Sequence, residues 1–255
     1  MKSKDCLIVG YGVVGSNIDA ELAPLNMEVY DKYKPSVTTK TKDKYDFGFI
    51  CVDTPLSSDD GQVDITEVRN AVNENDCGIY IIKSTCPVGF IDELKAETGK
   101  HIVYSPEFYG GTQHCNNFEF AFTVIGGDVD DCVKVQQLFQ LVYDARHKFY
   151  ITDAKTAAMV KFMDNSWLAT KVTFCCDFYR ACKKAGVNYE QLRELWVADP
   201  RVNPAHTFVY EDTPFFNSHC LNKDVPSIAN QFDMDLLKAV VDINKTYKPD
   251  DVKTV

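Results

Sequence analysis

The stretch CLIVGYGVVG, residues 6–15, joins a short apolar run to the start of a helical pattern. Its glycines permit a tight turn, close approach of a pyrophosphate to backbone N–H groups, and close packing of helix on strand. Asp31 ends the next apolar run, where a carboxylate binds the ribose hydroxyls of adenosine and repels a 2′-phosphate. This spacing predicts an NAD site, although Lys32 and Lys34 leave NADP open. The residues expected there are Gly10, Tyr11, Gly12, Val13, Val14, Gly15 and Asp31. The alternative is a glycine-rich turn in an unrelated α/β fold.

Outward from this loop, the first half of the chain alternates short apolar runs with amphipathic stretches. Strands are expected at 6–10, 27–31, 47–52, 77–85, 101–106 and 122–127, and helices at 14–25, 66–75, 90–97 and 129–143. Such alternation indicates an α/β fold with a Rossmann-type parallel sheet. From about Thr152 to Ala185 the pattern becomes one long helix, followed by helices at 189–198 and 233–246. We therefore expect an NAD-binding Rossmann domain at 1–150 and a smaller all-helical dimerisation and catalytic domain at 151–255.

Composition narrows the class of protein. The chain has 255 residues, is 45 % hydrophobic, and carries a net charge of −10 without a basic block, so a general nucleic-acid partner is not expected. Apolar runs are too short for a membrane-spanning helix or a signal peptide, which leads us to expect a cytoplasmic protein. Its ten cysteines lie mostly in apolar runs, which favours buried free thiols over disulfides. Histidine and cysteine spacing predicts no metal site.

Five further segments, which follow the glycine loop along the chain, carry polar residues that could form a site. They are VDTP (52–55) with GQVD (61–64), KSTCPVG (83–89), SPEF (105–108), KFMDN (161–165) and CLNKD (220–224). In that order they resemble the V-x-T-P…G-x-x-D, K-S-T-V-P-V-G, N-P-E-F, K-x-x-x-N and C-F-P-K-D motifs of the UDP-glucose/GDP-mannose dehydrogenase family, nearest its UDP-glucose 6-dehydrogenase branch. The resemblance extends over roughly residues 5–247.

The resemblance implies a reaction, a substrate and a set of residue roles. The reaction is the NAD-dependent oxidation of a sugar C6 alcohol to a carboxylate, with UDP-glucose or a similar UDP-hexose as substrate, in polysaccharide biosynthesis. Cys220 would be the nucleophile, Lys161 and Asp224 would assist deprotonation through water, Lys161 and Asn165 would stabilise the oxyanion, and Glu107 and Thr85 would position water. Cofactor contacts would also come from Val52, Asp53, Thr54, Ser84 and Thr85. Substrate contacts would come from Glu107, Phe108, Tyr109, Lys161, Asn165, Arg201, Phe216 and Cys220.

The residues themselves give a consistent interpretation. Lys161 and Asn165 are four apart and share one helix face, in an apolar setting that suits an amine for proton transfer. The alternative is a solvated lysine and a surface amide. Cys220 and Asp224 are also four apart. The tripeptide Asp224-Val225-Pro226 is typical of a first helical turn, and such a turn would favour the thiolate form of Cys220. The alternative for Cys220 is another buried thiol. Glu107 follows a predicted strand, on the rim where ligands of open α/β sheets bind; the alternative is a simple loop carboxylate.

Three departures from the family pattern are visible. Family members carry a third domain after the central helix, whereas this chain ends at Val255, so a short form is expected, with a partner chain as one possible source of that domain. The family's G-F-G-G-S before the cysteine is Phe215-Phe216-Asn217-Ser218-His219 here, and the second carboxylate of P-E-F-x-x-E is Gly111. The link between Asp31 and Phe47 is also short enough to have lost a helix.

Two hypotheses therefore remain. The first is an NAD-dependent sugar-nucleotide dehydrogenase that forms a homodimer through its long helix. Its apolar residues fall on more than one face (Ala158, Phe162, Trp167, Leu168, Val172, Phe174 and Phe178). The second is a non-catalytic NAD-binding or regulatory subunit that needs a partner chain for the missing domain. Reduction of NAD⁺ by a panel of sugar nucleotides distinguishes them.

Overall fold

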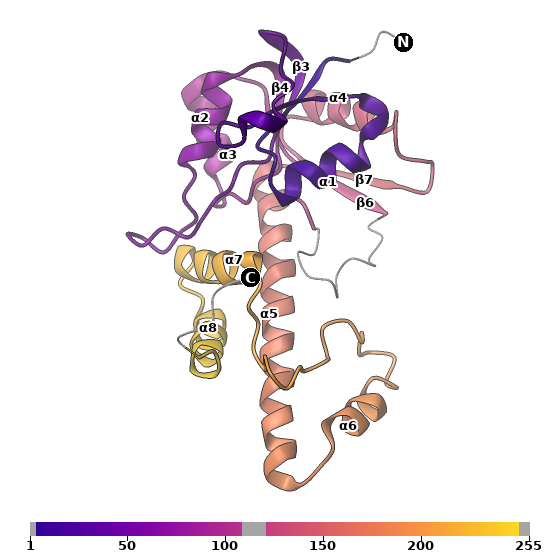
Figure 1. The fold of residues 1–255 in the computed structure, drawn as a ribbon, viewed down its shortest axis with the longest axis vertical. Coiled ribbons are helices and arrows are strands. Elements are labelled where there is room, and N and C mark those ends of the chain that lie inside the picture. Colours follow the sequence, from indigo (N-terminus) through magenta and orange to yellow (C-terminus); the bar gives the residue numbers. More distant parts are fainter. Residues whose placement is uncertain (1–3, 109–120, 250–255) are drawn as a thin grey trace. The chain divides into compact units, whose positions relative to one another are not determined.

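The computed structural model describes residues 4–108 and 121–249. The chain forms two compact units, each described here by itself. The first comprises Met1–Asp59 and Val63–Lys161, and the second comprises Asp60–Gln62 and Phe162–Val255 (Figure 1). Helix α5 (Ala154–Ala185) contributes residues to both.

The first unit is built on a seven-stranded sheet in the order β2-β1-β3-β4-β5-β6-β7. The strands are β1 (Cys6–Val9), β2 (Glu28–Tyr30), β3 (Lys44–Ile50), β4 (Asp76–Ile82), β5 (Ile102–Tyr104), β6 (Phe122–Gly126) and β7 (Lys148–Thr152). Every pairing from β2 to β5 is parallel, which confirms the Rossmann-type prediction.

Two features of the far edge of the sheet differ from the prediction. Strand β6 pairs antiparallel with β5, at Tyr104 and Gly126, so the sheet is mostly rather than wholly parallel. Strand β7, parallel to β6, was not predicted. An apolar run does not reveal the direction of its strand. Moreover, Lys148 and Tyr150 are exposed on β7. The sequence of β7 therefore does not show the continuous apolar run that is typical of a strand buried on both faces.

Helices cover both faces of the sheet and form two apolar cores. One core joins alternate strand residues to α2 (Thr66–Glu74), α3 (Phe90–Thr98) and the first turns of α5. The other joins the remaining strand residues to α1 (Val13–Glu21) and α4 (Val129–Phe139). The alternation is plain in β1, where Leu7 and Val9 belong to the first core and Cys6 and Ile8 to the second. Helix α4 ends four residues before the predicted end at 143.

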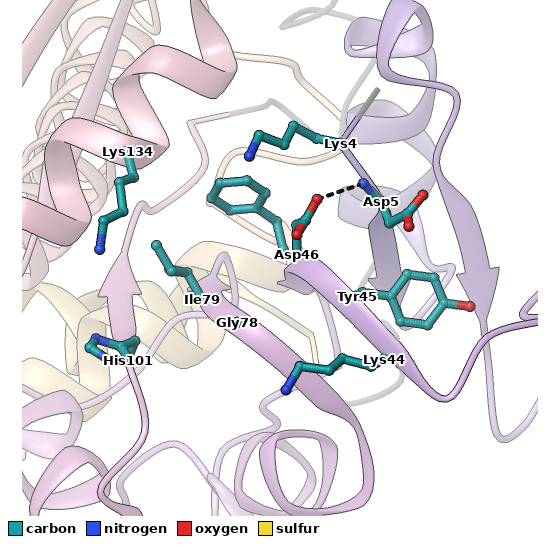
Figure 2. A pocket seen from close by; sticks show the side chains of 10 residues that line it. Lys4, Asp5, Lys44, Tyr45, Asp46, Gly78, Ile79, His101 and Lys134 are labelled. Atoms are coloured by element: carbon teal, nitrogen blue, oxygen red, sulfur yellow. Dashed lines mark hydrogen bonds between the residues drawn. The ribbon is translucent and has the colours of Figure 1, made fainter. Parts of the chain in front are cut away.

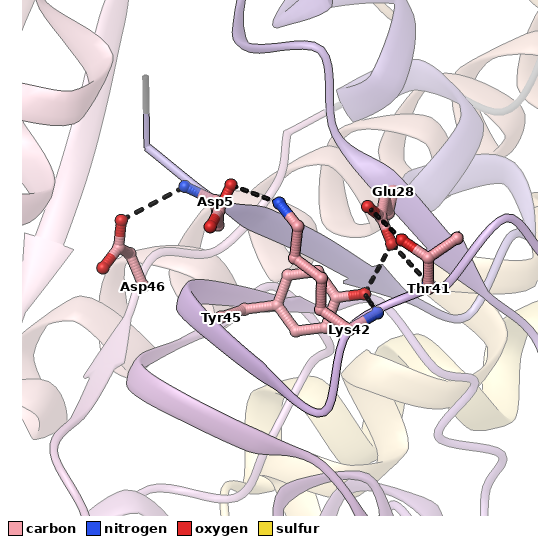
Figure 3. Close-up of polar contacts among 6 residues, drawn as sticks. All are labelled: Asp5, Glu28, Thr41, Lys42, Tyr45 and Asp46. Atoms are coloured by element: carbon pink, nitrogen blue, oxygen red, sulfur yellow. Dashed lines mark hydrogen bonds and ion pairs between the residues drawn. The ribbon is translucent and has the colours of Figure 1, made fainter. Parts of the chain in front are cut away.

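The link from β2 to β3 crosses β1 without an α-helix. A parallel crossover normally carries one, but this link holds a 3₁₀ helix (Pro35–Val37) instead, as its short length suggested. Polar contacts hold it in place (Figure 3). The Glu28 carboxylate accepts hydrogen bonds from the Thr41 hydroxyl (2.8 Å) and the Tyr45 hydroxyl (2.6 Å), and Lys42 pairs with Asp5. The hydrogen bond from Tyr45 lowers the pKa of Glu28 below its ordinary value.

The second unit is helical in its described residues. Helix α5 is 32 residues long and is not broken near Asn165, as predicted. It is followed by α6 (Tyr189–Trp196), α7 (His219–Gln231) and α8 (Asp235–Tyr247). The prediction that Asp224-Val225-Pro226 forms a first helical turn was wrong. Helix α7 begins at His219, because the Ser218 side chain caps it by accepting from the Leu221 amide, and Pro226 lies inside the helix.

The described cysteines are free thiols. Eight are buried, from Cys6 to Cys182, and Cys220 alone among those described is partly exposed. Burial raises the pKa of several thiols, including Cys6 and Cys77, each to about 12. These thiols stay protonated at neutral pH and act as small apolar side chains. None of the described helices is both long enough and apolar enough to cross a bilayer.

Candidate functional site

The first unit gathers its candidate residues at the carboxyl ends of β2, β1, β3, β4 and β5. Chain order reverses between β1 and β3, and open α/β sheets bind ligands at such a point. The glycine loop lies there. Gly10 has φ +90, and a Cβ on it would lie 2.9 Å from the backbone of Cys51 and Val52. A Cβ on Gly15 would lie 2.1 Å from the Gly10 carbonyl oxygen. Both positions therefore require glycine for close packing of strand and helix.

Gly12 serves a different purpose in this loop. A Cβ on Gly12 would meet no heavy atom of the described residues within 4 Å, so the missing side chain leaves open space in front of the backbone. Helix α1 starts directly after it, and neither a capping side chain nor an acidic residue occupies its first turn among the described residues. The amide groups of that turn are available to a phosphate, and the helix dipole favours its charge. The loop thus fits the pyrophosphate of a dinucleotide.

The Asp31 carboxylate lies beside the glycine loop and helps to hold it. Its Oδ2 accepts a hydrogen bond from the Tyr11 amide (2.7 Å), and its Oδ1 accepts from the amides of Tyr33 (2.8 Å) and Lys34 (2.9 Å). The Lys34 ammonium donates to the Tyr11 carbonyl at 3.0 Å. A carboxylate offers about four acceptor positions, so Asp31 retains capacity for a ribose hydroxyl.

Removing this carboxylate is expected to weaken NAD binding selectively. In Asp31→Ala the dissociation constant for NAD should rise at least about tenfold, because a hydrogen bond to a charged group contributes roughly 1.5–3 kcal/mol. Affinity for NADP should change less. Calorimetric titration of both cofactors measures this, with Asp19→Asn as a matched control, since Asp19 accepts from the Tyr11 hydroxyl (2.6 Å) on the same loop. Equal affinity of the unaltered protein for the two cofactors would contradict the assignment.

The loops after β3 and β4 lie side by side at the same edge. The Ser84 hydroxyl donates to the Val52 carbonyl (2.6 Å), and the Lys83 amide donates to the Ile50 carbonyl (2.9 Å). Thr54 and Thr85 are buried next to them, whereas Asp53 is exposed. The predicted cofactor residues of these two loops are therefore brought together. Their contact with a cofactor stays a prediction.

Glu107 follows β5 and forms an ion pair with Lys83, which sequence reasoning did not single out. The Lys83 ammonium also donates to the Ser105 hydroxyl at 3.1 Å. Burial raises the pKa of Glu107 above its ordinary value, while the charge of Lys83 acts in the opposite direction. A carboxyl group that is paired with a buried lysine and has a raised pKa suits proton transfer, and the role of Glu107 in catalysis stays a prediction.

Helix α5 carries Lys161 and Asn165 on one face, one turn apart. Their exposed fractions are 6 % and 4 %, so the alternative of a solvated lysine and a surface amide is wrong. The Lys161 ammonium lies 5.3 Å from the centroid of the Phe108 ring, a distance at which the ring attracts a cation.

In the second unit, Asn165 and Asp224 meet between α5 and α7. The Asn165 amide donates to Asp224 Oδ2 at 2.6 Å, and the Lys223 ammonium contacts Oδ1 at 2.7 Å. Asp224 is wholly buried. A buried carboxylate is stable only when paired and hydrogen-bonded, and these two neighbours meet that need.

Cys220 lies in the first turn of α7, one turn before Asp224 on the same face. It is partly exposed, unlike the other described cysteines, so the alternative of one more buried thiol is wrong. Accessibility and position together make Cys220 the described thiol best suited to covalent chemistry.

Two family models match this chain. The NAD-binding domain of the UDP-glucose/GDP-mannose dehydrogenase family matches residues 16–145, and the central domain of the same family matches residues 155–246. The chain belongs to the UDP-glucose/GDP-mannose dehydrogenase family. The predicted resemblance is thereby confirmed, and so is NAD as the cofactor of the first unit.

Similar proteins in this family include several dehydrogenases. A UDP-glucose 6-dehydrogenase of Rickettsia prowazekii is 28 % identical over 219 residues, which cover 79 % of this chain and 49 % of that protein. A UDP-N-acetyl-D-mannosamine dehydrogenase of Methanocaldococcus jannaschii is 27 % identical over 245 residues, covering 85 % and 56 %. The chain thus spans about half the length of the curated relatives it matches. A solved UDP-glucose dehydrogenase from Pyrobaculum islandicum has the same fold, with TM-score 0.80, 20 % identity and coverage of 95 % of this chain and 68 % of that one.

The remaining substrate residues inferred from this family fall in three different settings. Phe216 is buried, and its backbone is clamped by the Asn244 side chain of α8, which accepts from the Phe216 amide (2.9 Å) and donates to its carbonyl (3.0 Å). This clamp fixes the segment before Cys220. Arg201 is 87 % exposed and pairs with Asp199 at 2.6 Å. Tyr109 lies outside the described residues, as does Gly111.

Sequence reasoning missed Lys83, Lys223 and Asn244. The two lysines lie inside the family motifs and could have been found as the charged neighbours of Glu107 and Asp224. Asn244 carried no sequence signal, because its contact with Phe216 joins residues distant in the chain.

Another cavity lies elsewhere in the first unit. It measures about 400 Å³ and opens at the amino ends of β1, β3 and β4 (Figure 2). Lys4, Lys44, His101 and Lys134 line it, together with Asp5 and Asp46. Ligands of this fold bind at the carboxyl ends of the strands, so the cavity is not part of the candidate site.

Proposed function

We propose that the chain oxidises the C6 alcohol of a UDP-sugar to the carboxylate with NAD, and that UDP-glucose is the sugar nucleotide. Residues 1–150 would form the cofactor domain and residues 151–255 the catalytic and dimerisation domain. The observation that carries the proposal is the position of Cys220. It is an accessible thiol one turn from Asp224, and Asp224 accepts a hydrogen bond from Asn165.

The first oxidation requires removal of the alcohol proton. NAD, when bound, accepts the hydride that leaves the carbon. Lys161 and Asp224 assist loss of the hydroxyl proton through a water molecule. The fixed orientation of Asp224 between Lys223 and Asn165 supports this role, because a base must be positioned before it can transfer a proton.

The second oxidation requires that the aldehyde stay bound. The Cys220 thiolate attacks the aldehyde carbon to give a thiohemiacetal, whose oxyanion Lys161 and Asn165 stabilise. Loss of a second hydride, which a second NAD⁺ would accept, converts the thiohemiacetal into a thioester on Cys220. Glu107 and Thr85 position the water that hydrolyses the thioester, which releases the carboxylate and regenerates the thiol. In the described part of the chain, no other partly exposed cysteine can take this place.

A substrate panel tests the proposal. The protein is incubated with NAD⁺ and UDP-glucose, UDP-N-acetylmannosamine or GDP-mannose while NADH absorbance is followed. Formation of NADH with UDP-glucose above the others is expected. No NADH with any of them, alone or with a candidate partner chain, would favour the second hypothesis, a non-catalytic NAD-binding subunit. The position of Cys220 argues against that second hypothesis.

We also expect a homodimer built on α5. Met163 and Trp167 are 78 % and 59 % exposed on this helix, and burial of each large apolar side chain stabilises an interface by about 1.5–3 kcal/mol. Light scattering should give twice the 28.8 kDa chain mass. Trp167→Glu should shift the protein to monomer, whereas Leu236→Glu on α8, an equally apolar exposed site, should not. A monomer at dilute concentration before any substitution would refute the expectation.

A further inference from the structure

A small cavity in the first unit lies against Glu107. Its volume is about 30 Å³, which exceeds the roughly 10–15 Å³ that a single water requires. Its polar lining comes from Lys83, Glu107, Glu21, Tyr143 and Thr123, and Pro106, Phe108 and Phe122 complete the lining. A buried water needs two to four polar partners, and this lining provides them. The cavity is therefore both large enough and polar enough to hold one water.

Two of the lining residues form a hydrogen-bonded pair with each other. The Tyr143 hydroxyl donates to the Glu21 carboxylate at the end of α1. The Tyr143 ring stacks on His147 at 3.9 Å between centroids, and His147 Nε2 lies 2.8 Å from the Thr123 hydroxyl. Burial and the charge of Glu21 raise the pKa of Tyr143, so this hydroxyl remains a neutral donor at every physiological pH. Glu21 is partly exposed and reaches solvent.

In the proposed reaction, Glu107 takes up a proton that it must later release. Hydrolysis of the thioester transfers a proton from the attacking water, and Glu107 is the carboxylate that positions this water. Glu107 must lose that proton before the next cycle. We propose that a water in the cavity joins Glu107 to the Tyr143–Glu21 pair, and that this line conducts the proton from Glu107 to solvent. This inference rests on the proposed function, since Glu107 needs a proton exit only if it acts in turnover.

The transfer balances at each group. Protonated Glu107 gives its proton to the cavity water, which passes one of its own to the Tyr143 oxygen. Tyr143 releases its hydroxyl proton to Glu21, and Glu21 releases a proton to solvent. Each group ends as it began, and no oxidant or reductant is required.

The charges around Glu107 determine the direction in which its pKa changes when Glu21 is replaced. Lys83 after β4 and Lys161 on α5 lower its pKa, and Glu21 on α1 raises it. The nearby Cys51 thiol is neutral, because burial raises its pKa. Removing the charge of Glu21 should therefore lower the pH at which Glu107 ionises. Glu107 must be ionised to act as a base, so activity should rise as pH increases through that pKa.

The experiment compares Tyr143→Phe and Glu21→Gln with the unaltered protein. Tyr150→Phe is the control, because its exposed hydroxyl lies on neighbouring β7. Turnover is measured in H₂O and D₂O. The ionisation of Glu107 is followed by its infrared carboxyl band, assigned with Glu107→Gln. We expect Tyr143→Phe to lower kcat at least about tenfold with KM unchanged and a larger solvent isotope effect. We expect Glu21→Gln to shift the Glu107 titration to lower pH.

Each outcome decides the inference. Unchanged kcat and an unchanged Glu107 titration in both variants would overturn it. A lower kcat in Tyr143→Phe with the solvent isotope effect of the unaltered protein would indicate a structural role for Tyr143 and would also overturn it. If the unaltered protein reduces no NAD⁺, the proposed function fails, while a Glu107 carboxyl band that Tyr143→Phe leaves unchanged would still overturn the water link between Glu107 and Tyr143. If Tyr143→Phe does not fold, the kcat and solvent isotope effect of Glu21→Gln decide instead.

Discussion

Replacement of Cys220 by serine should abolish complete turnover while leaving NAD binding intact. Release of the carboxylate should fall at least about 10³-fold, because the thiolate both attacks the aldehyde and leaves the thioester, and a hydroxyl does neither well. The variant should stall after partial turnover and hold an ester or an aldehyde-level species on residue 220. Mass spectrometry of the peptide that contains this residue measures the adduct.

A second cysteine serves as the control for this variant. Cys182 lies near the end of α5 and is buried, so Cys182→Ala should retain turnover. NAD affinity should be unchanged in both variants, since neither residue belongs to the first unit. Turnover of Cys220→Ser at the rate of the unaltered protein would show that the thioester mechanism is wrong.

Replacement of Asp224 by asparagine should slow turnover about a hundredfold or more. The amide keeps the shape of the side chain and can still accept from Asn165, but it cannot take up a proton. The loss should appear in kcat rather than in the dissociation constant for NAD. Initial rates of NADH formation over a range of sugar-nucleotide concentrations give the two kinetic constants.

The same variant is expected to lose stability, because Lys223 loses its buried ion pair with Asp224. Breaking such a pair lowers the free energy of unfolding by roughly 3–5 kcal/mol. Urea unfolding separates this loss from the kinetic one. Asp242→Asn is the matched control, because Asp242 pairs with Lys245 on the surface of α8 and should affect neither quantity. A fully active Asp224→Asn would remove Asp224 from the proposed mechanism.

The sequence was most informative where chemistry demands particular residue types at short spacing. Gly10 and Gly15 are required by close packing that no side chain tolerates, so the glycine pattern predicted both the turn and the parallel sheet. Lys161 with Asn165, and Cys220 with Asp224, lie one helical turn apart, and their shared faces followed from spacing alone.

The features that the sequence did not predict depend on contacts between distant residues. The direction of β6 is set by its pairing with β5, and β7 forms because it pairs with β6 despite its exposed side chains. Helix α7 begins earlier than the position of Pro226 predicts, because the Ser218 cap determines where the helix begins. The clamp of Asn244 on Phe216 likewise joins two segments whose proximity no local pattern encodes.

The ratio of NADH formed to sugar nucleotide consumed tests the central claim most directly. A cysteine-tethered oxidation of an alcohol to a carboxylate transfers four electrons, so each UDP-glucose should yield two NADH and one UDP-sugar acid, without free aldehyde. The measurement combines NADH absorbance with chromatography of the sugar nucleotides after complete conversion. The account predicts a ratio of two. A ratio of one with aldehyde released into solution would contradict it.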